Sequence, residues 1–372
     1  MSDVKIVPVR TSKQLKDFIH TPWNLYQGDE KWVPPLRMAV ADLLKPKHPF
    51  YETSDMQNFV AYQGKKPIGR ISAVWNKNHN DFHEEKRGFI GFTEFPNDQE
   101  IAQKLFDTAE KWLKEKGANC ILGPMNPSTN YECGTLVEGF EDPAQIMMTY
   151  NQPYHDDLYK KNGYTKAKDL IAYRLKTEFD MPEIIKRIAD RTEKKEKITY
   201  RHAKKKNWDA EVDLMHEIYN DAWEKNWGFI PMTPAEFLHT AKDLKTIIDE
   251  KLIIIVEVDN KPAGFIVTLP DLHQVLKKIP NGKLLPTGLF KLLNQKKYVN
   301  RCRVITLGMK KEFRKKGLET LLYTKAHQVI KEQGYGEIEM SWILEDNLNM
   351  NKPLIRMGGE PYKKYRIYQK EI

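Results

Sequence analysis

Basic residues gather in one short stretch of the chain, between a run typical of a buried strand and a run with helical spacing. The stretch reads Arg314-Lys315-Lys316-Gly317-Leu318. Residues 304–307 before it are mostly apolar and β-branched, and apolar residues recur at helical spacing after it. The unpaired N–H groups and the positive dipole end at a helix start suit an anion such as a pyrophosphate. The stretch predicts either an anion-binding turn or an ordinary basic connection between a strand and a helix.

The same stretch resembles the acyl-coenzyme A binding segment of the GNAT acetyltransferase superfamily, in which Arg/Gln-x-x-Gly-x-Gly/Ala joins a strand to a helix. Arg314 and Gly317 fit this pattern, whereas Glu319 stands where the family usually has a small residue. Further on, Asn347 and Gly358 are similar to the family's second signature. In that signature a Tyr commonly protonates the departing thiolate, and Leu354 stands at its position. The resemblance covers 300–368 most firmly and extends to bacterial tandem-GNAT proteins.

The resemblance implies that acyl-coenzyme A is the co-substrate and that the strand before the basic stretch helps to hold it. This strand would present backbone N–H groups of Leu307, Gly308 and Met309 to the cofactor and to the reacting carbonyl. Gly308 either marks a bulge that splays the strand from its neighbour or is required only for packing. The expected cofactor-binding residues are Leu307, Gly308, Met309, Arg314, Lys315, Lys316, Gly317, Leu318 and Asn347.

Acyl transfer to an amine also requires a base that delivers the amine in its neutral form. Asp271 and His273 follow a predicted hairpin strand and are candidates for this role, or they form a turn with an exposed His. Aromatic residues at helical spacing and polar residues in the long loop 123–154 are candidates for binding the acceptor, although such aromatics are often core. The expected acceptor-binding residues are Trp223, Asn226, Trp227, Asn130 and Glu132.

The composition limits the classes of partner and of cofactor. The formal net charge is +9, which suits anionic ligands or an anionic membrane surface. No basic run interleaved with aromatics of the RNA-binding type is present, so we expect no nucleic-acid partner. Cys120, Cys133 and Cys302 have spacings that fit neither a disulfide framework nor a zinc site, so we expect no metal. Without an apolar span or a signal-peptide pattern, a cytoplasmic location is expected.

The order of the predicted elements repeats along the chain. Lys66-Pro67-x-Gly69 recurs as Lys261-Pro262-x-Gly264, at an offset of 262 − 67 = 195, and residues 159–163 match 354–358 at the same offset. The first copy has the acidic junction 96–100 instead of a basic turn. We therefore predict an α/β fold (an α+β mixed sheet) of two tandem GNAT-like domains, each with a mixed, largely antiparallel sheet flanked by helices. Residues 1–178 form a degenerate domain, 179–197 a linker, and 198–372 the domain with the acyl-coenzyme A site.

The resemblance favours an N-acyltransferase that moves an acyl group from acyl-coenzyme A to an amine. Bacterial GNAT-type enzymes include ceramide-forming ones, so a lipid, sphingoid-like amine is one specialisation. The insertion 272–298 is basic and rich in Leu, and either meets a membrane surface or packs on the sheet as an amphipathic helix. Two alternatives stay open: a Fem-like aminoacyl transferase, and a non-catalytic module that binds acyl-coenzyme A or a partner.

Overall fold

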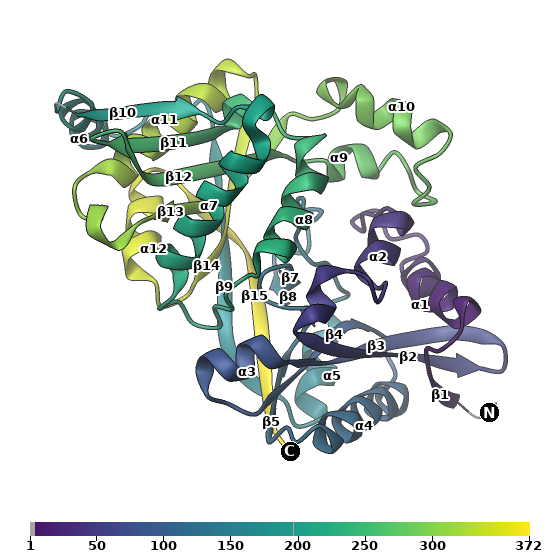
Figure 1. The fold of residues 1–372 in the computed structure, drawn as a ribbon. Coiled ribbons are helices and arrows are strands. Elements are labelled where there is room, and N and C mark those ends of the chain that lie inside the picture. The colour runs from purple at the N-terminus through teal and green to yellow at the C-terminus, as the bar shows by residue number, and fades with distance from the viewer. Residues whose placement is uncertain (1–3, 196) are drawn as a thin grey trace. The chain divides into compact units, whose positions relative to one another are not determined.

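The computed structural model describes residues 4–195 and 197–372, which divide into two compact units of mixed α/β structure (Figure 1). Unit 1 consists of the chain up to Leu170 together with Leu276–Leu293 and Lys363–Ile372. Unit 2 consists of Ile171–Val275 and Asn294–Tyr362. The predicted fold class is confirmed, since each unit contains a mixed, largely antiparallel sheet with flanking helices.

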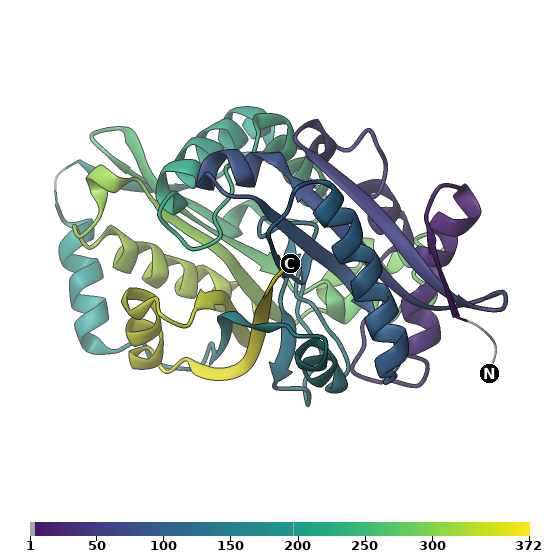
Figure 2. The ribbon, with the colours of Figure 1, turned by 90° about the horizontal axis from the view of Figure 1, so that it is seen from below.

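The sheet of unit 1 has the strand order β1-β2-β3-β4-β5-β15, with β8 also paired to β15. Its pairs are antiparallel except β4 with β5. Helix α4 packs on β3, and Figure 2 shows it lying along the strands. The elements are β1 (Val4–Pro8), α1 (Ser12–Leu25), α2 (Arg37–Leu43), η1 (Pro49–Glu52), β2 (Ser54–Gln63), β3 (Lys66–Asn76), α3 (Lys77–His83), β4 (Arg87–Glu94), α4 (Gln99–Glu115), β5 (Cys120–Gly123), β6 (Met125–Asn126), β7 (Glu132–Cys133), β8 (Thr135–Glu138), α5 (Tyr154–Lys161), α10 (Thr287–Leu293) and the C-terminal part of β15 (Glu360–Glu371).

The sheet of unit 2 has the order β9-β14-β13-β12-β11-β10. The pairs from β10 to β13 are antiparallel, and β13 pairs in parallel with β14. The elements are the C-terminal part of β9 (Thr165–Lys176), α6 (Glu183–Glu193), β10 (Ile198–His202), η2 (Lys205–Asn207), α7 (Trp208–Trp223), α8 (Pro234–Lys245), η3 (Glu250–Leu252), β11 (Ile253–Val258), β12 (Lys261–Pro270), most of α9 (His273–Leu276), η4 (Gln295–Lys297), β13 (Arg301–Met309), η5 (Lys311–Phe313), α11 (Leu318–Glu332), β14 (Glu337–Leu344) and α12 (Leu348–Arg356).

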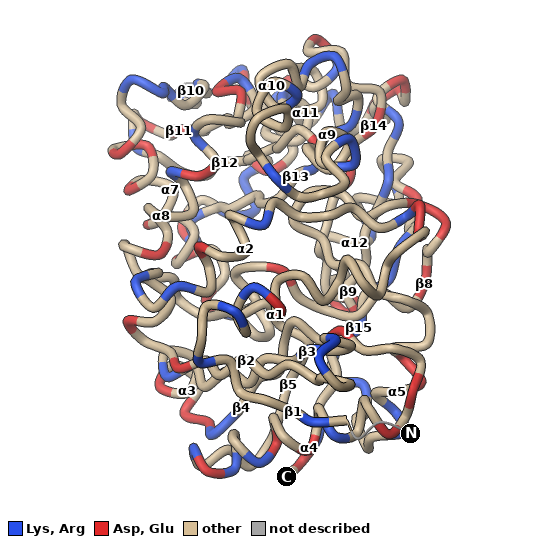
Figure 3. Tube along the Cα trace, turned by 90° about the vertical axis from the view of Figure 1, so that its right-hand side faces the viewer, with Lys and Arg blue, Asp and Glu red and all other residues tan. Residues whose placement is uncertain are grey.

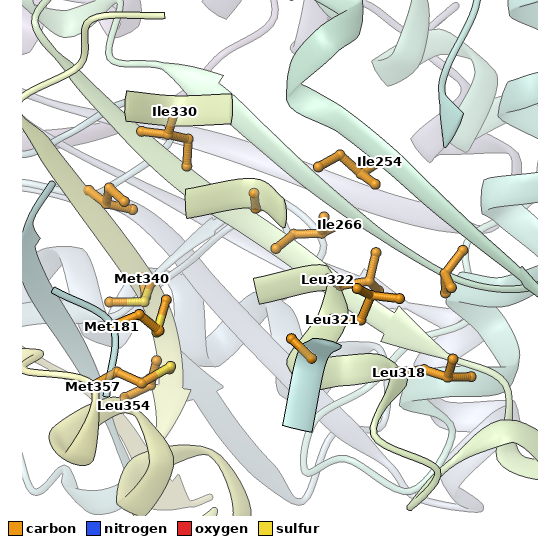
Figure 4. Packing of buried hydrophobic residues seen from close by; sticks show 14 of the residues in the cluster. Met181, Ile254, Ile266, Leu318, Leu321, Leu322, Ile330, Met340, Leu354 and Met357 are labelled. Atoms are coloured by element: carbon orange, nitrogen blue, oxygen red, sulfur yellow. The ribbon is translucent and has the colours of Figure 1, made fainter. Parts of the chain in front are cut away.

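One core cluster holds α11 against the sheet of unit 2. Leu318, Leu321 and Leu322 lie at helical spacing on the buried face of α11 and are fully buried. They meet alternate residues of the strands, such as Ile254 and Ile266 (Figure 4). Because strand side chains alternate between the two faces, the neighbours of these core residues point to the face opposite α11.

Register shifts occur at the same points of the two sheets. Between β2 and β3 the register shifts after Ala61, and between β11 and β12 it shifts after Val256, again 195 positions later (256 − 61 = 195). The strands that follow these shifts, β3 and β12, both begin with the repeated Lys-Pro-x-Gly sequence. The internal repeat therefore extends from the sequence to local strand geometry.

The units are not continuous segments of the chain. Strands β9 and β15 each begin in one unit and end in the other, so the last ten residues belong to the sheet of unit 1. The predicted boundaries at 178 and 198 treat each domain as one continuous segment, and as domain limits they stay a prediction. Within 179–197, Met181 and Ala189 join the core of unit 2, and α6 packs on α11. This segment is thus a structural part of unit 2.

Among the residues described, no helix is both long enough and apolar enough to cross a membrane.

Candidate active site

The strands β13 and β14 pair over only four residues and then separate. Their last parallel pair is Val304 with Met340, although β13 continues to Met309 and β14 to Leu344. On its other side β13 stays paired with β12, where Ile305 is an extra residue between the pairs Val267–Thr306 and Thr268–Val304. This bulge turns β13 away from β14. Alternate N–H groups of β13 beyond Val304 therefore face the diverging backbone of β14 without pairing to it, and we call this gap between the two backbones the slot.

The bulge lies three residues before the position expected for it. Gly308 is paired regularly with Phe265, and a Cβ atom at Gly308 would lie 2.6 Å from the Trp223 ring. Gly308 is therefore a packing glycine, and the interpretation that it marks the bulge was wrong. The predicted divergence of the strand from its neighbour is nevertheless present.

The start of α11 is shaped by two residues in the left-handed region. Gly317 has φ +85° and Lys315 has φ +62°, and the first turn of α11 has no side-chain cap. The N–H groups of this turn are thus available to an anion. A Cβ atom at Gly317 would lie 2.5 Å from the Thr192 hydroxyl of α6, so glycine is required for backbone conformation and for space.

The basic side chains around this turn divide into two sets. Lys310 pairs with Glu217 of α7, and Lys311 pairs with Glu224, the residue directly after α7, so both ammonium groups are neutralised. The guanidinium of Arg314 donates from Nε to the Met309 carbonyl (3.1 Å) and from Nη2 to the Ala222 carbonyl (2.8 Å). Arg314 therefore ties the turn to β13 and α7.

Lys315 and Lys316 complete the turn and are exposed. The Lys316 ammonium lies 5.0 Å from the centre of the Phe313 ring. Exposed ammonium groups beside uncapped helix N–H groups suit a pyrophosphate, so the residues present fit the phosphate end of coenzyme A. Asn347 precedes α12 at the end of β14, where it flanks the slot. The individual assignment of these residues to a cofactor stays a prediction.

Trp223 covers β13 on the face opposite α11. Its ring stacks on Tyr219 at 4.8 Å and lies 6.4 Å from the ring of Phe265. With its contact at Gly308, Trp223 forms an apolar wall beside the slot. Asn226 and Trp227 follow in the loop after α7, where the Asn226 N–H donates to the Trp223 carbonyl. The structure therefore brings the predicted Trp223 and Gly308 together.

A buried polar cluster lies where β13 and β14 begin to separate. Glu339 is fully buried and faces away from α11; one carboxylate oxygen accepts a hydrogen bond from the Ser341 hydroxyl (2.6 Å), and the other accepts one from the Tyr362 hydroxyl. Arg303 Nε lies 3.5 Å from the Glu339 carboxylate and donates to the Ser341 hydroxyl at 2.9 Å. None of these residues is among the site residues predicted from the sequence, although Glu339 and Ser341 alternate with apolar residues in a strand that is otherwise typical of a core.

Burial raises the pKa of Glu339, while the Arg303 guanidinium and the hydroxyls of Ser341 and Tyr362 act in the opposite direction. Desolvation disfavours the charged carboxylate, and the donors stabilise it. A carboxylate whose pKa is raised accepts a proton more readily than an ordinary carboxylate does. Tyr362 is only partly buried, so its hydroxyl links the buried carboxylate to the less buried side of the cluster.

Asp271, the first candidate for the base, is fully buried, and its carboxylate accepts a hydrogen bond from Arg301 Nη2 at 2.6 Å. It also accepts one from the backbone N–H of His273, at the start of α9. This pattern is a turn fixed by an ion pair. His273 is half-buried at the start of α9, and a role of Asp271 or His273 as the base stays a prediction. Asp271 lies close enough to Glu339 to raise the pKa of that carboxyl further.

Leu354 is buried in the core with Met340 and Met357 (Figure 4). A leucine has no hydroxyl, so Leu354 cannot act as the acid that the family's Tyr provides; Tyr362 is a tyrosine that contacts the Glu339 carboxylate. Glu319 lies in the first turn of α11, where a carboxylate interacts favourably with the helix dipole.

The corresponding place in unit 1 is filled by the chain itself. Strand β4 pairs with β5 only from Arg87 to Phe89, and beyond that point the Asn126 carboxamide accepts a hydrogen bond from the Phe92 N–H at 2.6 Å. A Cβ atom at Gly91 would lie 1.8 Å from the Met125 carbonyl oxygen. The contact between β4 and β6 thus leaves no open slot there, consistent with a degenerate first copy. The predicted acceptor-binding residues Asn130 and Glu132 follow β6, Asn130 in the next loop and Glu132 at the start of β7.

A cavity of about 600 Å³ in unit 2 lies elsewhere, lined by residues that include Asp249, Pro270 and Tyr335. Pro270 pairs with Cys302, at the opposite end of β13 from the slot. The cavity is therefore separate from the candidate active site.

Comparison with known proteins agrees with this geometry. Residues 212–357 match the acetyltransferase (GNAT) family, and these residues contain the slot, the basic turn and α11. The chain belongs to this family and is an N-acyltransferase.

Two similar proteins match the chain over nearly its full length. It is 36% identical to a protein named bacterial ceramide synthase from Caulobacter vibrioides, with 100% of this chain and 98% of the relative covered. It is 34% identical to the protein YghO of Escherichia coli, with 96% and 93% covered. A tandem GNAT protein from the clavulanic acid biosynthesis pathway superposes over 99% of this chain and 98% of its own, with a TM-score of 0.60 at 11% identity. That similarity extends the family's fold to both units.

Proposed function

We propose that this enzyme transfers a long-chain acyl group from acyl-coenzyme A to the amine of a lipid, with a sphingoid-like base as acceptor. The observation that carries the proposal is the open slot between β13 and β14, with the Glu339 cluster at its closed end and the uncapped start of α11 beside it. The lipid character of the acceptor is supported by the full-length similarity to a protein named bacterial ceramide synthase.

The donor would be held at two places in unit 2. The N–H groups at the start of α11, with the exposed Lys315 and Lys316, would bind the pyrophosphate. The unpaired edge of β13 beyond Val304 would hydrogen-bond the pantetheine arm and the thioester oxygen. Acyl-coenzyme A supplies the activated carbonyl carbon, and no metal is needed for this chemistry.

The acceptor amine must lose a proton before it can attack. We assign this step to Tyr362 and Glu339 acting together: the ammonium proton passes to the Tyr362 oxygen while the hydroxyl proton passes to the Glu339 carboxylate. Arg303 remains charged beside the carboxylate and stabilises its ionised form before the transfer. Glu339 and Tyr362 thereby replace Asp271 and His273 as our candidates for the base.

The acceptor side of the slot would be the apolar wall formed by Trp223, with Asn226 and Trp227 in the adjoining loop. A long-chain amine gains binding free energy from such a wall in proportion to the apolar area it buries. Because a lipid amine resides in a bilayer, peripheral contact with a membrane surface is part of the proposal.

The test is a survey of donors and acceptors with the purified protein. Acetyl- and palmitoyl-coenzyme A are each offered with dihydrosphingosine and with a short, water-soluble amine, while free thiol and amide product are measured. We expect thiol release and amide formation only with palmitoyl-coenzyme A and the lipid amine. Transfer to short amines alone would refute the lipid assignment.

The Fem-like alternative predicts a different donor. Transfer from aminoacyl-tRNA, with no heat of binding for coenzyme A, acetyl-coenzyme A or palmitoyl-coenzyme A, would replace our proposal with that activity. Heat of binding without turnover on any amine would instead favour a module that only binds acyl-coenzyme A.

A further inference from the structure

A short basic segment of unit 1, residues 277–293, carries apolar side chains that face solvent. Leu285, Phe290 and Leu293 are 67%, 66% and 72% exposed. Six large apolar side chains are exposed in the described part of unit 1, and four of them lie between 285 and 293, with Leu289 as the fourth. Singly exposed apolar residues are ordinary, but a concentration of this kind marks an interaction surface. We call residues 277–293 the basic apolar segment.

The basic apolar segment is held to the rest of unit 1 by hydrogen bonds, so its apolar side chains are exposed on an ordered surface and not on a loose loop. The Trp23 indole N–H donates to the Pro280 carbonyl at 2.8 Å, and the Arg37 N–H donates to the Gly282 carbonyl at 2.9 Å. Gly282 has φ +63°, and a Cβ atom there would lie 2.5 Å from the Trp23 ring. These contacts hold one side of the segment against α1 and α2.

The other side of the segment leaves helix α10 uncovered. Gly288 is buried against Ile279 and the Lys283 carbonyl, so one face of α10 rests on the segment's own chain. Leu289, Phe290 and Leu293 lie on the remaining surface of this helix, whose ribbon is green in Figure 1. The alternative in which this amphipathic helix packs its leucines on the sheet is therefore wrong for these residues.

The charge around the apolar side chains has one sign. Residues 277–293 contain four lysines, at positions 277, 278, 283 and 291, and no Asp or Glu (Figure 3). The Lys291 ammonium donates to the Lys278 carbonyl, which places two of these lysines side by side. Exposed apolar side chains in a segment whose only charged residues are lysines match a bilayer whose surface carries anionic headgroups.

We propose that the basic apolar segment binds the surface of anionic lipid bilayers, with Leu285, Leu289, Phe290 and Leu293 inserted among the headgroups and the lysines on the phosphates. The inference deepens the proposed function, because a lipid amine must be taken from a membrane. Binding to vesicles is nevertheless measured without any donor or acceptor, so it can fail or succeed independently of the reaction.

The first test is sedimentation of the full chain with phosphatidylglycerol-containing vesicles and with pure phosphatidylcholine vesicles. We expect binding to the anionic vesicles, weakened by salt. Because each lysine near an anionic surface contributes roughly fivefold to partitioning, Lys277→Glu with Lys283→Glu should reduce binding by more than tenfold. Lys65→Glu with Lys114→Glu is the matched charge control, since both lysines are exposed in unit 1 outside the segment.

The apolar contribution is tested by Phe290→Ser with Leu293→Ser. Both side chains are exposed, so the exchange removes no core packing, and an unchanged melting temperature would verify the fold. Binding should fall by at least tenfold, whereas Ile184→Ser, at a 57% exposed residue outside the segment, should leave it unchanged. Wild-type protein that ignores anionic vesicles, or a Phe290/Leu293 variant that binds as wild type, would overturn the proposal.

Two further outcomes separate the alternatives. The wild-type protein could instead be a dimer that does not bind vesicles. If the Phe290/Leu293 variant is then monomeric, the patch joins two copies of this chain and the membrane proposal is wrong. If vesicle binding depends on the segment but no amide forms with any lipid amine, the proposed function fails while this inference stands. If the proposed function and this inference are both correct, the Phe290/Leu293 variant should lose turnover on vesicle-bound amine and retain turnover on micellar amine.

Discussion

Tyr362→Phe tests the role of the buried cluster, because it removes one hydroxyl and leaves the ring in place. The hydroxyl donates to the fully buried Glu339 carboxylate. A hydrogen bond to a charged group contributes about 1.5–3 kcal/mol, so the melting temperature should fall by a few degrees. If the hydroxyl carries the ammonium proton, turnover should fall by about 10²–10⁴-fold, a much larger effect than the loss of stability explains.

The assay separates these two effects. Thiol release is followed under single turnover, and coenzyme A affinity is measured by calorimetry, which the substitution should not change. Because the Tyr362 hydroxyl lowers the pKa of Glu339, its loss raises that pKa further, and the pH at which activity rises should move upward. Activity requires the ionised carboxylate, so turnover increases as pH rises through this pKa and is lost below it.

Tyr335→Phe is the matched control, since Tyr335 lines the cavity at the opposite end of β13 and its ring is partly buried in the same unit. It should leave turnover and the pH profile unchanged. A Tyr362→Phe enzyme with wild-type turnover and a wild-type pH profile would show that the cluster only stabilises the divergence of β13 and β14. In that case the base must be sought elsewhere.

Three further changes test other parts of the structure. Glu319→Gln removes a negative charge from the first turn of α11 and should tighten coenzyme A binding by roughly two- to fivefold in calorimetry, since like charges close together in water repel by about 1 kcal/mol or less; weaker binding would contradict the proposed phosphate site. Gly317→Ala should lower the free energy of unfolding by roughly 2–4 kcal/mol, through φ +85° and the Thr192 contact, whereas Gly334→Ala at φ +82° in open space should cost only about 1–2 kcal/mol. If denaturant titrations showed the same loss of unfolding free energy for Gly317→Ala and Gly334→Ala, a steric contribution from the contact with α6 would be excluded. Burial lowers the pKa of His155 to about 3, so the free energy of unfolding should fall by about 1.4 kcal/mol for each pH unit from pH 6.5 down to 3. His155→Phe should remove this part of the pH dependence; an unchanged pH dependence of unfolding would refute the assignment.

The fold was predictable from the sequence wherever local pattern and tertiary environment agree. The strand before the basic turn and helix α11 follow from periodicity, since their apolar residues form the core of unit 2. The exchange of β9 and β15 between the units was not predictable, because each strand has the same alternation whichever sheet completes it. Helix α6 lies within the predicted linker 179–197. Its buried face holds Ala189 and Thr192, whereas Ile184 and Ile188 are exposed, so these large apolar side chains do not mark the face that packs on the rest of unit 2.

The candidate site was predictable at its phosphate end and not at its reactive end. Arg314 and Gly317 belong to a compact local motif, although the structure gives Arg314 a bracing role between Met309 and Ala222. The Glu339 cluster joins residues from three strands that are close only after the sheet forms. Its one local indication was a carboxylate at an inward-facing position of a strand, which requires a buried partner.

The interleaving of the two units also constrains how the chain is made. Strand β5 of unit 1 pairs with Tyr368–Glu371 of β15, so its partner is translated about 250 residues after it (371 − 120 = 251). Until those residues leave the ribosome, the edge of β5 has unpaired backbone groups of the kind that promote aggregation. Unit 1 therefore completes its folding only after unit 2 has been synthesised. Expression of the first half alone, or removal of the last ten residues, should yield insoluble protein even though most of unit 1 is encoded at the start.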